Sequence, residues 1–273
     1  MASIKIALAQ MNSQDNWRVN LVTVGDYVRR ASQKGAKAIL FPENTLYVGN
    51  PGRLYRIAGE LKKGLAISAI QNMARIYKLA ILVGSFPEQK PGTRLVYNTS
   101  LWIDEQGTPL SRYRKMHLFD VQTPKGIRYR ESDHVSPGDS LASFSWKGIQ
   151  IGLSICYDLR FPEMYRKLSA LGAQWLIIPS AFTEETGRAH WHKLLAARAI
   201  ENLATVIAPA QTGRSPMNRK TFGHSLVVNP WGKVVREAGN KPGLSFLSIS
   251  NLEGARLRKR FPVLLKGRNV RNA

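Results

Sequence analysis

Cys156 is the single cysteine of the chain, and its surroundings favour a nucleophile. It follows the alternating segment 151–155, which is typical of a strand, and precedes Pro162, which suits the first turn of a helix. A side chain in such a strand-to-helix turn can project from the edge of a sheet, with the following backbone N–H groups aimed at an anion formed beside it. A small buried hydrophobic side chain is the alternative interpretation.

A thiol nucleophile needs a base or a cation nearby, because a free pKa of about 8.5 leaves it mostly protonated at neutral pH. Glu43 and Lys115 each follow a predicted strand, at the kind of position where open α/β sheets bind ligands. The Glu43 carboxylate could accept the thiol proton, and the Lys115 ammonium could stabilise a thiolate or an oxyanion. Judged by position alone, Glu43 could equally be a solvated loop carboxylate and Lys115 an ordinary surface lysine.

The histidines offer a second kind of partner for the thiol. A cysteine–histidine pair is not excluded by spacing. Neither a His-x-x-x-His spacing nor a cluster of cysteine and histidine residues is present, so no metal is expected. The histidines considered are His117, His190, His192 and His224.

Short apolar, β-branched runs alternate with helical patterns and predict an α/β fold. Some strands are joined by helices and others by tight turns, which predicts mixed sheets covered by helices. No stretch is rich enough in Pro, Gly and Ser to be a linker, so 1–273 is expected to form a single domain with 251–273 as a basic C-terminal arm. The expected helices are 21–32, 61–77, 163–171 and 190–203. The expected strands are 4–9, 38–41, 79–84, 98–103, 110–113, 141–145, 149–155, 175–178, 206–208, 223–228, 233–237 and 244–249.

Length and composition are those of an ordinary globular protein. The chain has 273 residues, of which 44% are hydrophobic, 9% aromatic and 21% charged, so it can bury a sizeable core. No window reaches the roughly 18 apolar residues that a membrane span needs. Residues 1–16 have the pattern of a strand and not of a signal peptide. A cytoplasmic protein without a membrane segment is therefore expected.

The charge is the unusual part of the composition. Lys and Arg number 40 against 18 Asp and Glu, which gives a net charge of +22. Such a balance suits contact with nucleic acid or another anionic partner. Zinc-finger spacing, an RNA-recognition signature and a heptad zipper are all absent from the sequence. A basic surface for solubility or for acidic small ligands is therefore preferred, and a nucleic-acid-binding protein is the alternative.

Three sequence blocks, in this order, resemble the nitrilase or carbon–nitrogen hydrolase superfamily. They are Phe-Pro-Glu at 41–43, Tyr-Arg-Lys-Met-His-Leu at 113–118 and Ile-Cys-Tyr-Asp-Leu-Arg-Phe-Pro-Glu at 155–163. The likeness covers nearly the whole chain. Arg-Glu-Ser at 130–132 and Ala-His-Trp at 189–191 make it most similar to the branch of deaminated glutathione amidases, with the ω-amidases next.

This resemblance implies a four-layer α-β-β-α sandwich with mixed sheets and a triad of Glu43, Lys115 and Cys156. Glu43 would take the thiol proton, and Cys156 would attack an amide carbonyl. Lys115 and the backbone N–H of Tyr157 would stabilise the oxyanion, and Glu131 would hold the lysine and orient the substrate. Water activated by Glu43 would then hydrolyse the thioester intermediate. No metal or cofactor is implied.

The resemblance also implies a small acidic amide as substrate. The first expectation is deaminated glutathione, hydrolysed to 2-oxoglutarate and cysteinylglycine; 2-oxoglutaramate, or another aliphatic amide or N-carbamoyl compound, is the alternative. The loops 41–56 and 214–221 depart from the branch, and both are expected to line the pocket. A homodimer or a higher homo-oligomer is expected by analogy.

Several other polar side chains are expected to have structural roles under this scheme. His117 and His224 are expected to make hydrogen bonds in the core, and His190 to pack near the pocket. Arg160 and Arg198 are expected in buried ion pairs, with binding of a substrate carboxylate as the alternative.

Overall fold

Side chains along the first strand alternate between two apolar cores. The computed structural model describes residues 3–123, 126–250, 252–261 and 264. In β1 (Ile4–Gln10), Ile6 and Leu8 pack into one core, and Ala7 and Ala9 pack into the other. Successive side chains of a strand leave opposite faces of its sheet, so β1 lies between two layers.

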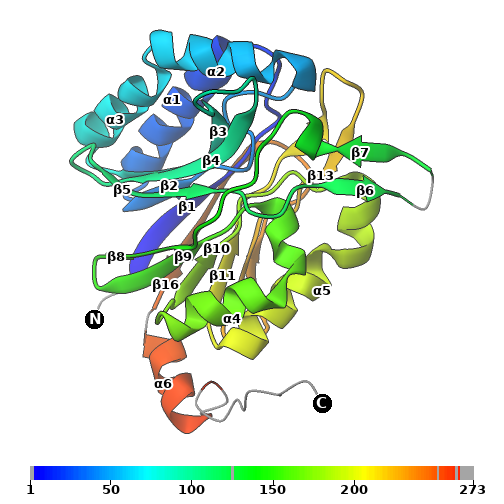
Figure 1. Cartoon of the computed structure of the whole chain (residues 1–273). Helices are drawn as coiled ribbons and strands as arrows, with labels where there is room; N and C mark the ends of the chain where they lie inside the picture. Colours follow the sequence, from blue (N-terminus) through cyan, green and yellow to red (C-terminus); the bar gives the residue numbers. More distant parts are fainter. Residues whose placement is uncertain (1–2, 124–125, 251, 262–263, 265–273) are drawn as a thin grey trace.

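Two six-stranded sheets lie face to face (Figure 1). Both are mixed: β1-β2-β3 and β9-β10-β11 are parallel runs, and the outer strands pair antiparallel. The first sheet has the order β16 (Gly243–Ile249), β1, β2 (Ala38–Leu40), β3 (Ala80–Gln89), β4 (Val96–Ile103), β5 (Pro109–Arg114). The second has the order β15 (Val234–Glu237), β14 (Leu226–Val228), β11 (Thr205–Ala208), β10 (Trp175–Ile177), β9 (Ile149–Leu153), β8 (Ala142–Trp146).

Helices cover the outer face of each sheet and complete the expected four-layer α-β-β-α sandwich (Figure 1). On the first sheet lie α1 (Trp17–Gln33), α2 (Leu54–Lys63) and α3 (Ala66–Tyr77); on the second lie α4 (Pro162–Ala170) and α5 (Glu184–Asn202). Two small hairpins extend the ends of the sandwich: β6 (Asp120–Gln122) with β7 (Arg128–Arg130), and β12 (Thr212–Arg214) with β13 (Lys220–Phe222).

The prediction of one helix over 61–77 is wrong. The chain forms α2 and α3 instead, because Gly64 ends the first helix and Leu65 adopts a left-handed φ of 53° before the second begins. The helix expected at 190–203 begins earlier, at Glu184, since the Thr183 hydroxyl accepts a hydrogen bond from Thr186 N and caps it.

The expected C-terminal arm is helical over most of the residues that the structure describes there. Residues Leu252–Arg260 form α6, and Arg258 Nε donates to the Leu203 carbonyl at 3.1 Å, so the helix contacts the second sheet's helical layer. Residues 262–263 and 265–273 of the arm lie outside the described residues. Within the described ranges, no helix combines the length and the hydropathy needed to cross a membrane.

A close backbone crossing fixes the segment that carries Glu43. Gly84 in β3 lies against the backbone of Phe41 and Pro42, and a Cβ at this position would overlap both carbonyl groups. The next residue, Ser85, holds the same segment just after Glu43: its Oγ accepts a hydrogen bond from Asn44 N at 2.7 Å. The chain after β2 is therefore pressed onto β3, and only glycine fits at the crossing.

Replacing Gly84 by alanine is expected to lower the free energy of unfolding by about 2–4 kcal/mol, because two backbone segments must separate and no rotamer can relieve the overlap. Denaturant unfolding measures this loss. Gly239→Ala is the matched control, since a Cβ there meets no atom within 4 Å. Equal effects of the two substitutions would contradict the close crossing.

Candidate active site

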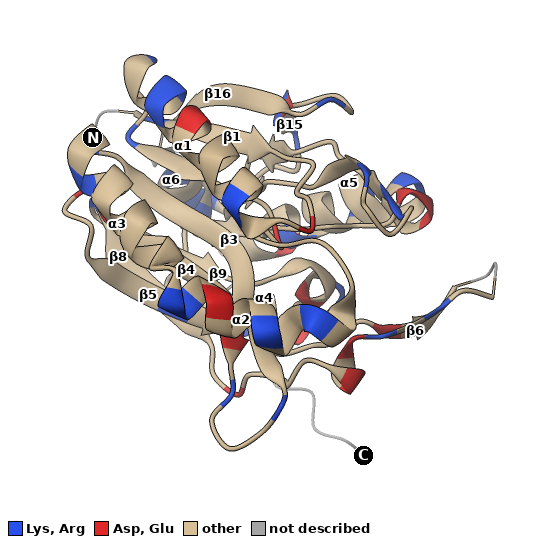
Figure 2. Cartoon of the chain, turned by 90° about the horizontal axis from the view of Figure 1, so that it is seen from above, with Lys and Arg blue, Asp and Glu red and all other residues tan. Residues whose placement is uncertain are grey.

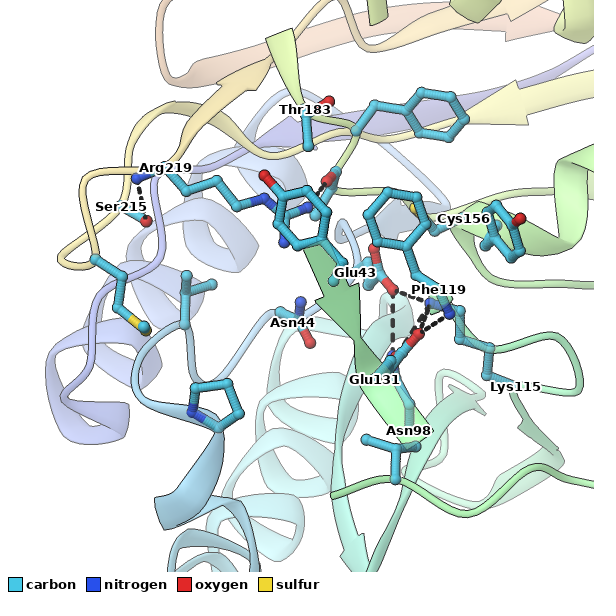
Figure 3. Close-up of a pocket in the computed structure, with 18 of the residues that line it drawn as sticks. Glu43, Asn44, Asn98, Lys115, Phe119, Glu131, Cys156, Thr183, Ser215 and Arg219 are labelled. Atoms are coloured by element: carbon cyan, nitrogen blue, oxygen red, sulfur yellow. Dashed lines mark hydrogen bonds and ion pairs between the residues drawn. The ribbon is translucent and has the colours of Figure 1, made fainter. Parts of the chain in front are cut away.

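A cavity of about 1020 Å³ opens at the strand ends, and all five residues expected at the site line it (Figure 3). These residues come from distant parts of the sequence. Glu43 follows β2, Lys115 follows β5, and Glu131 begins the short helix η2 (Glu131–Asp133) after β7. Cys156 and Tyr157 begin a second short helix, η3 (Cys156–Arg160), after β9.

Lys115 is the centre of the charged group at the base of this cavity. Its Nζ lies 2.9 Å from Glu43 Oε1, 2.9 Å from Glu131 Oε2 and 3.1 Å from Glu131 Oε1. The lysine side chain is only 2% exposed. Burial alone would lower the pKa of Lys115, but the negative charges of Glu131 and then Glu43 outweigh it and hold that pKa well above its usual value. The ammonium therefore stays charged.

Asn98 is a member of this group that the sequence did not indicate. Its Nδ2 donates to Glu43 Oε1 at 3.2 Å and to Glu131 Oε1 at 3.4 Å. Its backbone carbonyl accepts from Lys115 N at 2.9 Å. A polar residue in a strand carries no distinctive signal, so only the pairing of β4 with β5 reveals this contact. Asn98 holds the two carboxylates on either side of the ammonium.

Cys156 is buried beside this charged group in an unusual backbone conformation. Its φ is 49°, in the left-handed region, and its N–H donates to the Pro179 carbonyl at 3.0 Å. Burial, and then the negative charge of Glu43, raise the pKa of the thiol well above its usual value, while Lys115 acts in the opposite direction. The resting sulfur is therefore a neutral thiol beside the Glu43 carboxylate.

The backbone of Glu43 is fixed from the opposite side of the sandwich. Gln211 Nε2 donates to the Glu43 carbonyl at 2.9 Å and to Ser13 Oγ at 2.8 Å. Ser13 N in turn donates to Gln211 Oε1 at 3.0 Å. These buried bonds, together with the crossing at Gly84, position the carboxylate against the thiol and the ammonium.

Asp158 holds the turn that presents the thiol. Its Oδ2 accepts from Ile155 N at 2.9 Å and from the Tyr113 hydroxyl at 2.6 Å. Its Oδ1 accepts from His117 N at 3.0 Å. The N–H of Tyr157 lies in the first turn of η3, where backbone donors have no partner within the helix, so it is available to an anion beside the sulfur.

This arrangement suits acyl transfer. A neutral thiol lies next to a carboxylate that can accept its proton, and a fixed ammonium lies where an oxyanion would form. A family model described as carbon-nitrogen hydrolase matches residues 5–257. The chain belongs to the carbon–nitrogen hydrolase family. It is a hydrolytic amidase with the fold of the nitrilase superfamily.

Two relatives illustrate the family. The hydrolase is 40% identical over 270 residues to a deaminated glutathione amidase of Synechocystis sp., with 94% of this chain and 96% of the relative covered. It is 34% identical over 273 residues to the human omega-amidase NIT2, with 98% and 96% covered.

Solved structures show the same fold. The crystal structure of the C. elegans NitFhit protein matches with a TM-score of 0.92 and 34% identity, covering 98% of this chain and 66% of that chain. The hydrolase thus spans just under two thirds of the NitFhit chain. A Glu-to-Gln mutant of the amidase from Nesterenkonia sp. AN1 matches with a TM-score of 0.81 and 29% identity, covering 95% of this chain and 97% of that chain. Its structure shows the acetamide moiety of fluoroacetamide added covalently at the active-site cysteine.

Both loops expected to line the pocket of the hydrolase do so. Asn44, Tyr47 and Leu54 come from the loop at 41–56, and Met217 and Arg219 come from the loop at 214–221. Because these segments connect or extend strands and carry few sheet bonds, they can vary while the charged group beneath them stays in place.

The histidines near the site have structural partners. His117 Nδ1 lies 2.7 Å from Asp158 Oδ1, and its ring stacks on Phe161 with centroids 3.7 Å apart, so the expected structural role of His117 is confirmed. His190 lies near the pocket as expected: it is exposed on α5, and its Nδ1 lies 3.2 Å from Nη2 of Arg160, which lines the cavity.

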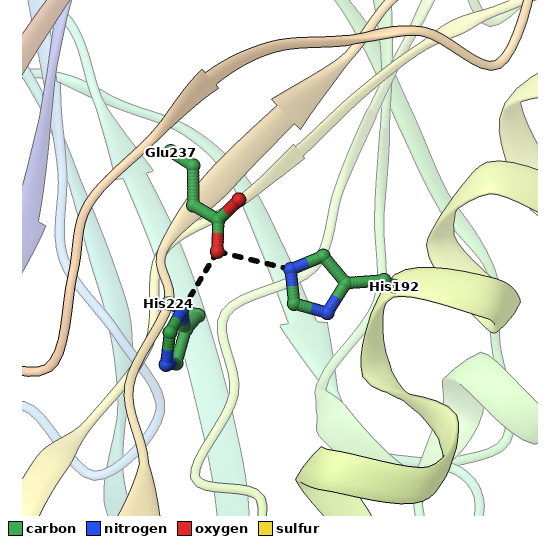
Figure 4. Close-up of side chains that lie close together, drawn as sticks. All are labelled: His192, His224 and Glu237. Carbon is green, nitrogen blue, oxygen red and sulfur yellow. Dashed lines mark hydrogen bonds and ion pairs between the residues drawn. The ribbon is translucent and has the colours of Figure 1, made fainter.

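His224 is not a core residue, and it belongs to a group that the sequence spacing did not predict. The ligand atoms of His192, His224 and Glu237 lie within 4.8 Å of one another among the residues described (Figure 4). Glu237 Oε1 accepts from both rings, at 3.0 Å and 2.7 Å. Metal-bound imidazoles normally use their second nitrogen to bond a carboxylate or a carbonyl, and neither ring does so within the described ranges. The group therefore serves as a hydrogen-bonded link between α5 and β15.

The two arginines singled out in the sequence have different places. Arg198 is buried and structural: its Nε donates to the Leu159 carbonyl at 3.0 Å, and its Nη1 pairs with Glu201 at 2.9 Å. The bond to Leu159 ties η3 to α5. The pair with Glu201 confirms the ion pair predicted for Arg198. Arg160 instead lines the cavity.

Basic side chains of the hydrolase are spread over several elements. Figure 2 shows Lys and Arg on α1, α2, α5 and β5, with Asp and Glu among them. Several are paired with acids on the same surface, such as Arg29 with Asp26 at 2.6 Å. This distribution accords with a basic surface in general more than with a groove for nucleic acid.

Replacing Glu43 by glutamine is expected to have two opposite effects: the Cys156 thiol ionises more easily, and amide hydrolysis becomes slower. The substitution removes a negative charge that raises the pKa of Cys156, so that pKa falls and the thiolate forms at lower pH than in the wild type. Amide hydrolysis should fall by about 100- to 10,000-fold if the Glu43 carboxylate is the group that accepts the thiol proton. Ultraviolet titration of the thiolate and alkylation by iodoacetamide follow the first effect.

Glu163→Gln is the control for this charge change, since Glu163 is exposed at the start of α4. It should leave both the thiol titration and the turnover unchanged. A Glu43→Gln protein whose thiol titrates at higher pH than the wild type would contradict the electrostatic coupling between Glu43 and Cys156.

Proposed function

We propose that the hydrolase uses Glu43, Lys115 and Cys156 as a catalytic triad and forms a thioester with the acyl part of its substrate. The observation that carries this proposal is the buried ammonium of Lys115, held 2.9 Å from Glu43 directly beside the thiol. The covalent adduct on the active-site cysteine of the Nesterenkonia amidase, a structural relative, supports it.

The first half of the reaction forms the acyl-enzyme. Glu43 accepts the thiol proton as the sulfur of Cys156 attacks the amide carbonyl, and the carbonyl oxygen becomes an oxyanion. Lys115 and the Tyr157 N–H stabilise this oxyanion; removal of one such donor typically costs about 100- to 1,000-fold in rate. As the C–N bond breaks, Glu43 returns the proton to the leaving nitrogen, and a thioester remains.

The second half regenerates the thiol. Glu43 takes a proton from water, the resulting hydroxide adds to the thioester carbonyl, and the C–S bond breaks. As the C–S bond breaks, Glu43 returns this proton to the leaving thiolate, so the products are a carboxylic acid and the free enzyme with its thiol. Glu131 is a positioning residue: its Oε2 accepts from Lys115 Nζ and from Phe119 N, at 2.9 Å and 2.7 Å. It thereby holds the ammonium and the rim of the cavity together.

The preferred substrate in this proposal is deaminated glutathione, whose hydrolysis gives 2-oxoglutarate and cysteinylglycine. The 40% identity to a deaminated glutathione amidase supports it. The alternative is 2-oxoglutaramate, which would release ammonia; the 34% identity to an omega-amidase supports that reaction. A homodimer or larger homo-oligomer and a cytoplasmic location are further parts of the proposal, and both rest on the family resemblance.

The decisive experiment compares deaminated glutathione and 2-oxoglutaramate side by side, with wild-type protein and with Cys156→Ala. Turnover of deaminated glutathione is expected in the wild type, and complete loss is expected in the variant, because the thioester cannot form. Release of cysteinylglycine, ammonia and 2-oxoglutarate is measured, and thermal unfolding checks that Cys156→Ala is folded.

Each other result has a definite meaning. Turnover of 2-oxoglutaramate alone would assign the ω-amidase reaction. No turnover of either compound by a protein whose Cys156 is still alkylated by iodoacetamide would reject both substrates. Retained turnover in Cys156→Ala would reject the triad itself.

A further inference from the structure

The cavity contains two arginines whose charge is not neutralised by the protein. Its basic side chains are Lys115, Arg130, Arg160, Arg188, Arg219 and Lys220. Carboxylates pair with four of them: Glu43 and Glu131 with Lys115, Asp133 with Arg130, and Glu184 with both Arg188 and Lys220. In the described part of the chain, Arg160 and Arg219 have no carboxylate partner.

Hydrogen bonds hold Arg219 in place, but they do not use all of the donors of its guanidinium group. It lies in the loop between β12 and β13, where its N–H donates to Ser215 Oγ at 3.2 Å and its carbonyl accepts from Ser215 N at 2.9 Å. Its Nη2 donates to the Ala181 carbonyl at 2.7 Å, and its guanidinium lies 5.3 Å from the ring centroid of Tyr129. Its Nε is buried and has no hydrogen-bond partner among the described residues.

The guanidinium of Arg219 lies close to the reacting sulfur. Its Nη2 donates to the carbonyl of Ala181, and Ala181 and Cys156 both line the same cavity as Arg219. Figure 3 shows the Arg219 side chain reaching from its loop toward the part of the cavity that holds Glu43 and Cys156. A ligand in this cavity can therefore contact both Arg219 and the wall that carries Cys156.

We propose that Arg219 binds a carboxylate of the substrate and so selects amides that carry one. This inference rests on the amidase function proposed above. A guanidinium presents several N–H donors in a planar fork that matches a carboxylate, and a buried donor without a partner is costly until a ligand supplies an acceptor. The contacts to Ala181 and Tyr129 fix the fork before the substrate arrives, which reduces the entropic cost of binding.

Arg160 is less suited to this role. Its Nη2 already contacts His190 at 3.2 Å at an exposed part of α5. Both candidate substrates carry the carboxylate of a 2-oxo acid, and deaminated glutathione carries a second one on its glycine. Arg219 therefore distinguishes both compounds from neutral aliphatic amides of similar acyl length.

The test compares Arg219→Gln, Arg219→Lys and wild type on deaminated glutathione, 2-oxoglutaramate and the neutral amide butyramide. The ratio of kcat/KM for a carboxylate substrate to kcat/KM for butyramide is expected to fall about 10- to 100-fold in Arg219→Gln, mainly through KM. In Arg219→Lys this ratio should lie between those of the wild type and Arg219→Gln, because lysine keeps the positive charge but lacks the planar, two-donor geometry of a guanidinium. Loss on only one of the two acidic substrates would support the proposal and show which carboxylate is bound.

Arg29→Gln is the matched control, since it removes the same charge from an exposed arginine on α1 that does not line the cavity and is paired with Asp26 at 2.6 Å. Its ratio should stay within about 2-fold of the wild type, as expected for a screened surface charge. An equal loss on butyramide and on the acidic amides in Arg219→Gln would indicate a structural role only, and would overturn the proposal. So would an unchanged ratio.

A binding measurement keeps this test independent of turnover. Calorimetric titration of Cys156→Ala with glutarate, a dicarboxylate without an amide, should show binding that weakens about 10- to 100-fold when Arg219→Gln is added. If no amide is hydrolysed, the proposed function fails, while glutarate binding still decides the role of Arg219. Absence of glutarate binding that depends on Arg219 would reject the carboxylate site.

Discussion

Lys115 carries a positive charge at a position that is almost fully closed to water, and the organisation of the site follows from this one constraint. Burying an ammonium costs several kcal/mol unless opposite charges replace its hydration. Glu43 and Glu131 do this, each at 2.9 Å from Nζ. With two carboxylates and one ammonium, the group has a net negative charge. Burial, and then the negative charge of Glu43, raise the pKa of the adjacent Cys156 and keep its thiol protonated.

The need to hold these charges within hydrogen-bond distance explains the bonds around them. The two carboxylates come from segments far apart in sequence, and a shift of either would leave the buried ammonium incompletely paired. Gln211 and the crossing at Gly84 restrain the backbone at Glu43, and Asn98 bridges both carboxylates. The turn at Cys156 needs similar support, because a cysteine with its backbone in the left-handed region is strained. Asp158 offsets that strain by accepting several hydrogen bonds around the turn.

Chemistry and selectivity occupy different parts of the fold. The proposed triad lies at the ends of strands, where the sheets and two cores fix each side chain. The cavity walls come from the loops at 41–56 and 214–221 and from the start of α5. Such loops can change without disturbing the strands, so one reaction can be directed to different amides. Arg219, on one of these loops, is the residue that we propose binds a carboxylate of the substrate.

The sequence by itself determined the α/β class, the mixed sheets and most strands, because strands buried on one or both faces leave a clear apolar pattern. It also singled out Cys156, Glu43 and Lys115, since each follows a strand and each lies in a motif of the carbon–nitrogen hydrolases. It failed at the helix break near Leu65, where local backbone conformation and not hydrophobic spacing decides. Tertiary structure alone revealed Asn98, the link of His192 and His224 to Glu237, and the buried Nε of Arg219 that has no hydrogen-bond partner in the described part of the chain. These depend on which distant strands and loops meet, and a pattern along one chain does not encode the distance between two side chains that are far apart in sequence.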